Sequence, residues 1–107
     1  MAIALPAEKG ATAAGRRFAE WARAHTDVAA IVAVPLSGSV SIWTVLRDAQ
    51  SDTRRALYDL QVRTWEDFPD EPVTFRIIDL AEFPDTPPAE LLPPSGQRLF
   101  VAPAAGL

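Results

Sequence analysis

The sequence predicts a small two-layer protein of the α/β or α+β class, with its elements in the order α-β-β-α-β. Three stretches between residues 28 and 80 are short and rich in β-branched side chains, and a longer segment with helical periodicity separates the second from the third. A short turn joins strands antiparallel, whereas a strand–helix–strand crossover makes them parallel. We therefore expect a mixed three-stranded sheet.

The length of 107 residues fits one domain, and the sequence divides into three parts. Residues 1–10 are expected to form a loose N-terminal arm, residues 11–80 the α/β core, and residues 81–107 a tail with six of the ten prolines. The chain has no cysteine, no secretory signal pattern and no stretch near the ~20 apolar residues of a membrane span. These features predict a cytoplasmic protein that does not contact a membrane.

The first helix is predicted over residues 11–25. Phe18, Trp21 and His25 recur at helical spacing, which places them on one face. The helix should end near Thr26, because the hydroxyl of such a residue competes for backbone hydrogen bonds.

A β-hairpin is predicted to follow the first helix. Residues 28–34 are apolar on both faces, which is typical of a central strand. Residues 40–47 alternate between two faces and form the second strand. The segment Pro35–Ser39 is expected to be the turn, because proline ends a strand and Gly38 tolerates a positive φ.

The second helix is predicted over residues 53–68, with Ser51 or Asp52 as its N-cap and Pro69 directly after its end. Its large apolar side chains spread over an arc of roughly 200° on a helical wheel; they are Leu57, Tyr58, Leu60, Val62, Trp65 and Phe68. A helix on one sheet needs about half of that arc. The first helix, the tail or another subunit must cover the rest.

The third strand is predicted over residues 73–80, parallel to its neighbour because of the crossover. In the tail, Pro88–Leu92 is expected to form one helical turn with proline at its start. The segment Arg98–Ala102 can add a short fourth strand at an edge of the sheet.

The charge is acidic overall and uneven along the chain. A formal net charge of −4 argues against nucleic acid as a partner, because phosphate binding needs a cationic face. Residues 59–107 hold nine acidic and three basic side chains, whereas residues 1–58 hold seven basic and five acidic ones. This distribution fits a solvated acidic face, or complementary contacts between subunits or with a basic partner.

Polar residues give no clear catalytic or metal site. His25 has Asp27 nearby but no nucleophile-elbow sequence to work with, so we expect a histidine satisfied at the end of its helix. The acidic residues between positions 66 and 71 lack the spacing of a calcium loop and are expected to form a solvated turn.

Asp79 lies on the predicted third strand and Asp48 follows the second, and two carboxylates at related ends of a parallel pair can serve acid–base chemistry. We instead expect them to end their strands and form salt bridges with Arg47 or Arg76. No catalytic residue, metal ligand or cofactor is assigned, and the sequence does not favour an enzyme.

One short fragment keeps an enzymatic alternative open. Gly38-Ser39, followed nine residues later by Asp48, is similar to part of the nucleotidyltransferase signature. This resemblance implies a small or degenerate enzyme of that type. The signature requires a second aspartate where this chain has Gln50, and Gly38-Ser39 is predicted in a hairpin turn rather than ahead of a helix.

The expected function is that of a non-enzymatic interaction or accessory protein that forms a homodimer through its second helix. The candidate interface residues are Tyr58, Val62, Trp65 and Trp43, because exposed aromatic patches mark interfaces. A separate protein partner is a further expectation. The alternative is a small-molecule-binding regulatory domain that uses Trp43 and Arg76, since arginine beside an aromatic ring suits an anionic or planar ligand.

Overall fold

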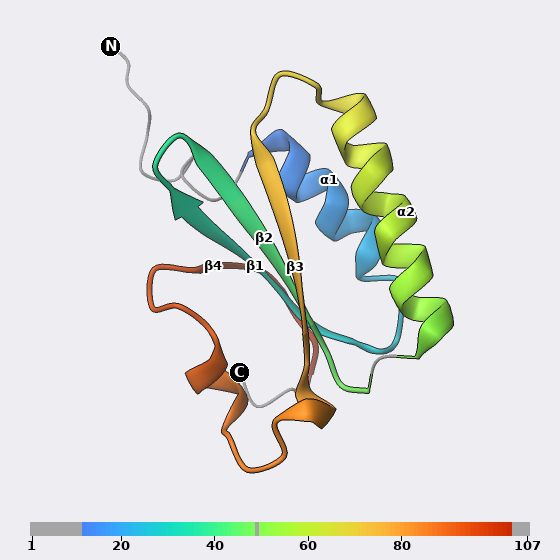
Figure 1. Cartoon of the computed structure of the whole chain (residues 1–107), viewed down its shortest axis with the longest axis vertical. Helices are drawn as coiled ribbons and strands as arrows, with labels where there is room; N and C mark the ends of the chain where they lie inside the picture. Colours follow the sequence, from blue (N-terminus) through green and yellow to red (C-terminus); the bar gives the residue numbers. More distant parts are fainter. Residues whose placement is uncertain (1–11, 49, 104–107) are drawn as a thin grey trace.

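The computed structural model describes residues 12–48 and 50–103, so the predicted arm of residues 1–10 lies outside the described part. Within that part, two α-helices, four strands and two short 3-10 helices follow one another (Figure 1). In chain order they are α1 (Ala13–Ala22), β1 (Val28–Leu36), β2 (Ser39–Leu46), α2 (Ser51–Asp67), β3 (Val73–Asp79), η2 (Leu80–Glu82), η3 (Pro88–Leu91) and β4 (Gln97–Val101).

The four strands form one mixed sheet in the order β3-β2-β1-β4. β1 pairs antiparallel with β2 and with β4, whereas β2 pairs parallel with β3. The predicted hairpin and parallel crossover are therefore confirmed, and the short segment near the C-terminus is the fourth, edge strand. β1 lies inside the sheet, as expected of a strand that is apolar on both faces.

The hairpin turn is tighter than the sequence predicts. Pro35 pairs with Val40 and Leu36 with Ser39, so β1 continues through its proline, and the prediction that Pro35 ends the strand is wrong. On its other side β1 pairs with β4 only as far as Ala33, so no β4 residue lies opposite Pro35 to accept the N–H that proline lacks. The turn itself needs Gly38, whose φ is +78°.

Both helices cover the same face of the sheet and lie side by side, with α2 along the β3 edge (Figure 1). The core between helices and sheet contains Phe18, Leu57, Ile31 and Ile42, all fully buried. The ring centroids of Phe18 and Phe75 lie 4.9 Å apart and join α1 to β3.

The C-terminal segment covers part of the opposite face of the sheet. Leu91 and Leu92 pack against Ala30, Val45 and Ile78 in a second, smaller core. The tail is therefore separated from α2 by the sheet, and this placement decides which surfaces remain open.

Two helix ends differ from prediction. α1 ends at Ala22, and His25 lies in the following turn, where its backbone N–H donates to the Ala22 carbonyl at 3.0 Å. The N-cap of α2 is Gln50 rather than Ser51 or Asp52. The start of α2 is set by a tertiary contact, because the Thr53 hydroxyl donates to Asp27 at 2.7 Å.

No helix in the described part of the chain has the length and apolar character needed to cross a lipid bilayer.

Candidate functional site

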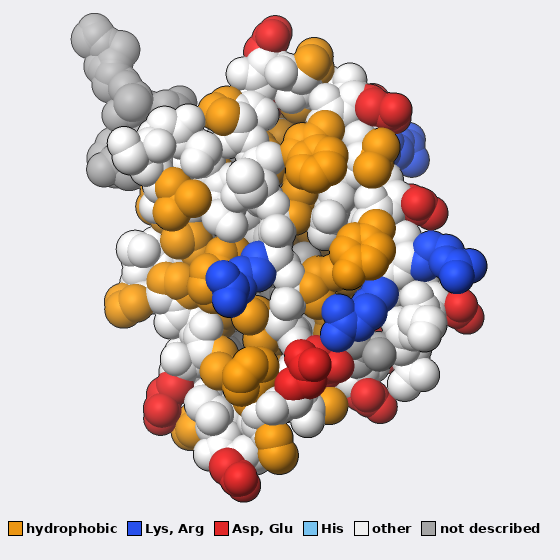
Figure 2. Space-filling view, viewed as in Figure 1, with side chains coloured by type: hydrophobic (Ala, Val, Ile, Leu, Met, Phe, Trp, Pro, Cys, Tyr) orange, Lys and Arg blue, Asp and Glu red, His pale blue; other side chains and the backbone are white. Residues whose placement is uncertain are grey.

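The most unusual surface is an apolar stripe on α2 formed by Tyr58, Val62 and Trp65. These residues are 50%, 49% and 45% exposed. They recur at i, i+4 and i+7, so they follow one line along the helix. Figure 2 shows hydrophobic side chains exposed along α2 as well as over the sheet. Large exposed apolar side chains gathered along one line of a helix are typical of a protein interface.

The buried side of α2 makes the stripe more conspicuous. Leu57 is fully buried, but Thr53 and Thr64 are buried with it. Each threonine needs a hydrogen bond to be there: Thr53 uses Asp27, and the Thr64 hydroxyl donates to the Leu60 carbonyl at 2.7 Å. α2 thus buries polar side chains while leaving three large apolar ones in solvent.

Two contacts hold the stripe in a fixed orientation beside β3. The indole N–H of Trp65 donates to the Val73 carbonyl at 2.7 Å, and the Trp65 ring meets the edge of Phe75 at 5.3 Å. At the other end of β3, Arg54 forms an ion pair with Asp79 at 3.5 Å. The helix is therefore tied to the outer strand at both ends, which orders the stripe before any partner binds.

Neither of the intramolecular covers expected from the sequence reaches the stripe. α1 packs on the other flank of α2, where Arg63 lies over the Trp21 ring at 4.3 Å and pairs with Asp67 at 4.0 Å. The described part of the tail lies on the opposite face of the sheet. Within residues 12–48 and 50–103, neither α1 nor the tail covers the stripe, and another subunit is the remaining cover of the three.

Trp43 is not part of the stripe, although the sequence grouped it with Tyr58 and Trp65. It lies on the sheet face opposite the helices, where the Arg76 guanidinium stacks over its ring at 4.9 Å. Its indole N–H donates to the Ser41 hydroxyl at 3.0 Å. The two predicted ligand residues, Trp43 and Arg76, are thus brought together, with the guanidinium over the indole ring.

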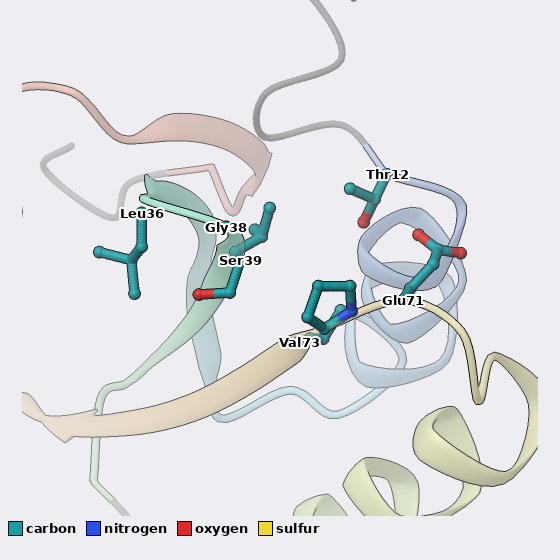
Figure 3. A pocket seen from close by; sticks show the side chains of 8 residues that line it. Thr12, Leu36, Gly38, Ser39, Glu71 and Val73 are labelled. Atoms are coloured by element: carbon teal, nitrogen blue, oxygen red, sulfur yellow. The ribbon is translucent and has the colours of Figure 1, made fainter.

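A groove that the sequence did not indicate lies at the hairpin end of the sheet. It has a volume of about 470 Å³, and Figure 3 shows Leu36 and Ser39 on its hairpin side and Thr12 and Glu71 on its helix side. Two of its polar side chains make contacts at the start of α1: the Thr12 hydroxyl accepts from the Gly15 N–H at 3.0 Å, and Glu71 accepts from the Ala14 N–H at 3.5 Å. In the sequence, the apolar Leu36 beside the predicted turn was the one local feature that pointed to this groove.

The carboxylates considered for chemistry are engaged in structural contacts. Asp79 pairs with Arg54 rather than with the predicted Arg47 or Arg76, and it also accepts from the Ala81 N–H at 3.0 Å. Asp48 is exposed and accepts from the Gln50 amide at 3.3 Å. Among residues 12–48 and 50–103, no group of three or more acidic or histidine side chains could hold a metal ion.

The nucleotidyltransferase-like fragment is split by the fold. Gly38 lies in the hairpin turn before β2, and Asp48 follows the far end of the same strand. A strand of eight residues such as β2 spans roughly 25 Å, so the two positions cannot serve one small site.

Searches of protein-family models, of curated proteins and of solved structures returned no match to this chain.

Proposed function

We propose that this protein is a non-enzymatic interaction or accessory protein that self-associates through α2. The observation that carries the proposal is the exposed stripe of Tyr58, Val62 and Trp65, which lies outside the buried face of α2. Burying such side chains removes apolar surface from water, at about 25 cal/mol per Å². A helix face with anchors at i, i+4 and i+7 is a common binding surface for a second helix.

A pre-ordered surface supports the same proposal. Trp65 is held by its hydrogen bond to Val73 and by its contact with Phe75. Ordering an interface side chain on binding costs about 0.5–1.5 kcal/mol, and this cost is lower for a side chain that is already fixed. Large aromatic side chains are also enriched among the residues that dominate binding energy.

A cytoplasmic location is retained within this proposal, since a cysteine-free chain needs no oxidising compartment. Binding of a separate protein partner, and a small-molecule role for Trp43 and Arg76, remain predictions from the sequence.

The first prediction concerns Val62→Glu. We expect the wild-type chain to form dimers at tens of micromolar, and the variant to be a monomer, because a carboxylate in the middle of the stripe cannot be buried without a partner. Size-exclusion chromatography with light scattering measures the mass. Val62 is the substitution of choice because, unlike Trp65, it makes no hydrogen bond that a change would break.

Val101→Glu is the matched control. Val101 is an exposed valine on β4, at the opposite edge of the sheet from α2. The control should remain a dimer, and both variants should keep the wild-type circular dichroism spectrum. A wild-type chain that stays monomeric at high micromolar concentration would rule out the proposed function.

A further inference from the structure

The charges of α2 run against its helix dipole. Arg54 and Arg55 lie in the first turns, Glu66 and Asp67 lie in the last turn, and that last turn has no basic residue. A helix by itself is stabilised by the reverse order, with acids near the N-terminus and bases near the C-terminus. Asp52 is the one charge of the expected sign at either end. The pattern therefore weakens the isolated helix and calls for another explanation.

Two of these four charges have partners within the subunit and two do not. Arg54 pairs with Asp79, and Asp67 pairs with Arg63. Arg55 and Glu66 are exposed, and neither forms an ion pair with any other residue of the described ranges.

Arg55 and Glu66 lie on the same flank of the stripe. Eleven residues separate them, which is about three turns of an α-helix and about 16 Å along its axis. Both lie within roughly 80° of Tyr58 on the side away from β3, since the β3 side is occupied by the contacts of Trp65 and Arg54. An unpaired base and an unpaired acid thus stand at opposite ends of one exposed apolar line.

We propose that two copies of this chain pack α2 against α2 in an antiparallel, two-fold arrangement in which Arg55 of each copy pairs with Glu66 of the other. The inference rests on the proposed self-association and specifies its geometry. A two-fold axis perpendicular to the paired helices brings equal flanks together and reverses their direction. The midpoint of Arg55 and Glu66 lies within about one residue of the midpoint of the stripe, so one axis serves the ion pairs and the apolar contact together.

The complementary charges select the second copy and the antiparallel direction. Parallel packing about an axis along the helices would put the equal flanks on opposite sides of the contact and leave Arg55 and Glu66 without partners. We expect a contact centred on one helix to bury less than the ~800 Å² per partner of a standard stable interface, and therefore a dissociation constant in the micromolar range.

The second prediction tests this geometry with Arg55→Glu and Glu66→Arg. Each variant alone replaces two attractive pairs by two repulsive ones and should weaken its homodimer about tenfold. The combination of both substitutions in one chain restores opposite charges and should restore dimerisation. Arg16→Glu, an exposed site on α1 with the same charge change, is the matched control and should have no effect.

A mixture of the two single variants gives the sharpest readout. Arg55→Glu chains and Glu66→Arg chains complement each other at both pairs, so native mass spectrometry of an equimolar mixture should find about nine-tenths heterodimer rather than the half expected by chance. Each variant should also melt at least as high as wild type when monomeric, because it improves the fit of α2 to its own dipole. Lost dimerisation therefore cannot be confused with lost folding.

The remaining outcomes separate the two proposals. A wild-type dimer that Val62→Glu dissociates, but that is indifferent to both charge reversals and shows no heterodimer preference, would overturn the antiparallel arrangement and leave the proposed function standing. A wild-type monomer would overturn both.

Discussion

At the scale of residues, the buried threonine hydroxyls differ in whether they have a hydrogen-bond partner. Thr44 lies in the middle of β2, on the helix-covered face between Ile31 and Ile77. Its hydroxyl is buried and has no hydrogen-bond partner among the described residues. The hydroxyls of Thr53 and Thr64 are buried as well, but each is bonded. Thr64 donates to the i−4 carbonyl of its helix and Thr53 to the Asp27 carboxylate, whereas the backbone groups around Thr44 in an inner strand are engaged in the ladder.

The third prediction follows for Thr44→Val. The substitution keeps the branched shape and removes the unpaired hydroxyl, so we expect the free energy of unfolding to rise by about 1 kcal/mol. Urea denaturation followed by tryptophan fluorescence measures it. Thr64→Val is the control and should gain nothing, because it removes a hydroxyl that donates to Leu60. An equal gain in both variants would show that the orphaned hydroxyl of Thr44 is not the cause.

At the scale of elements, the C-terminal segment depends on one close approach. A Cβ placed on Gly96 would lie 2.4 Å from Cγ1 of Val32 and 3.2 Å from the Pro93 carbonyl oxygen. Glycine is needed here for space rather than for an unusual φ. It lets the segment between η3 and β4 lie directly on the sheet, which guides β4 to its place beside β1.

The fourth prediction is that Gly96→Ala destabilises the protein by about 1–3 kcal/mol, the usual cost of overpacking a core. Chemical denaturation gives the value. Adding Val32→Ala to the same chain should cost less than the two separate losses combined, because it removes the atom that the new methyl group meets. The neighbouring exposed site, as Ser95→Ala, should be neutral. Strict additivity of Gly96→Ala and Val32→Ala would contradict the steric explanation.

At the scale of the whole molecule, the two faces of the sheet are covered by different segments of the chain. Two helices lie on one face and the C-terminal segment on the other (Figure 1). β4 forms one edge of the sheet, beside β1, and β3 forms the other edge. α2 lies along the β3 edge. The stripe of Tyr58, Val62 and Trp65 stays exposed because the tail that the sequence offers as its cover crosses to the other side.

The fifth prediction couples folding to assembly. A partner that binds only the folded chain raises its stability, so the Tm of the wild-type protein should increase with protein concentration. For a domain of this size we expect a rise of about 5 °C for each hundredfold increase above the dissociation constant. Differential scanning calorimetry across that range measures it. Val62→Glu should show a constant Tm, and a constant Tm in the wild type would argue against dimerisation.

Local patterns account for what was predictable from the sequence. Alternation over residues 40–47, the apolar run from Val28 and the helical periodicity after Ser51 each depend on side chains a few positions apart, and all three elements were found. The turn at Pro35 was predicted too long, because only the position of β4 reveals that this proline lacks a neighbour to bond. The partner of Asp79 was missed for the same kind of reason, since Arg54 reaches it from α2.

The sequence by itself determined the helices, the strands and the surplus of apolar surface on α2, because periodicity along one element is a property of neighbouring residues. Only the tertiary structure decided where that surplus lies. In the structure, Trp43 lies on one face of the sheet and Trp65 lies beside the β3 edge. The tail packs on the face opposite α2. These placements depend on contacts between distant segments, and each is set by the packing of the whole chain.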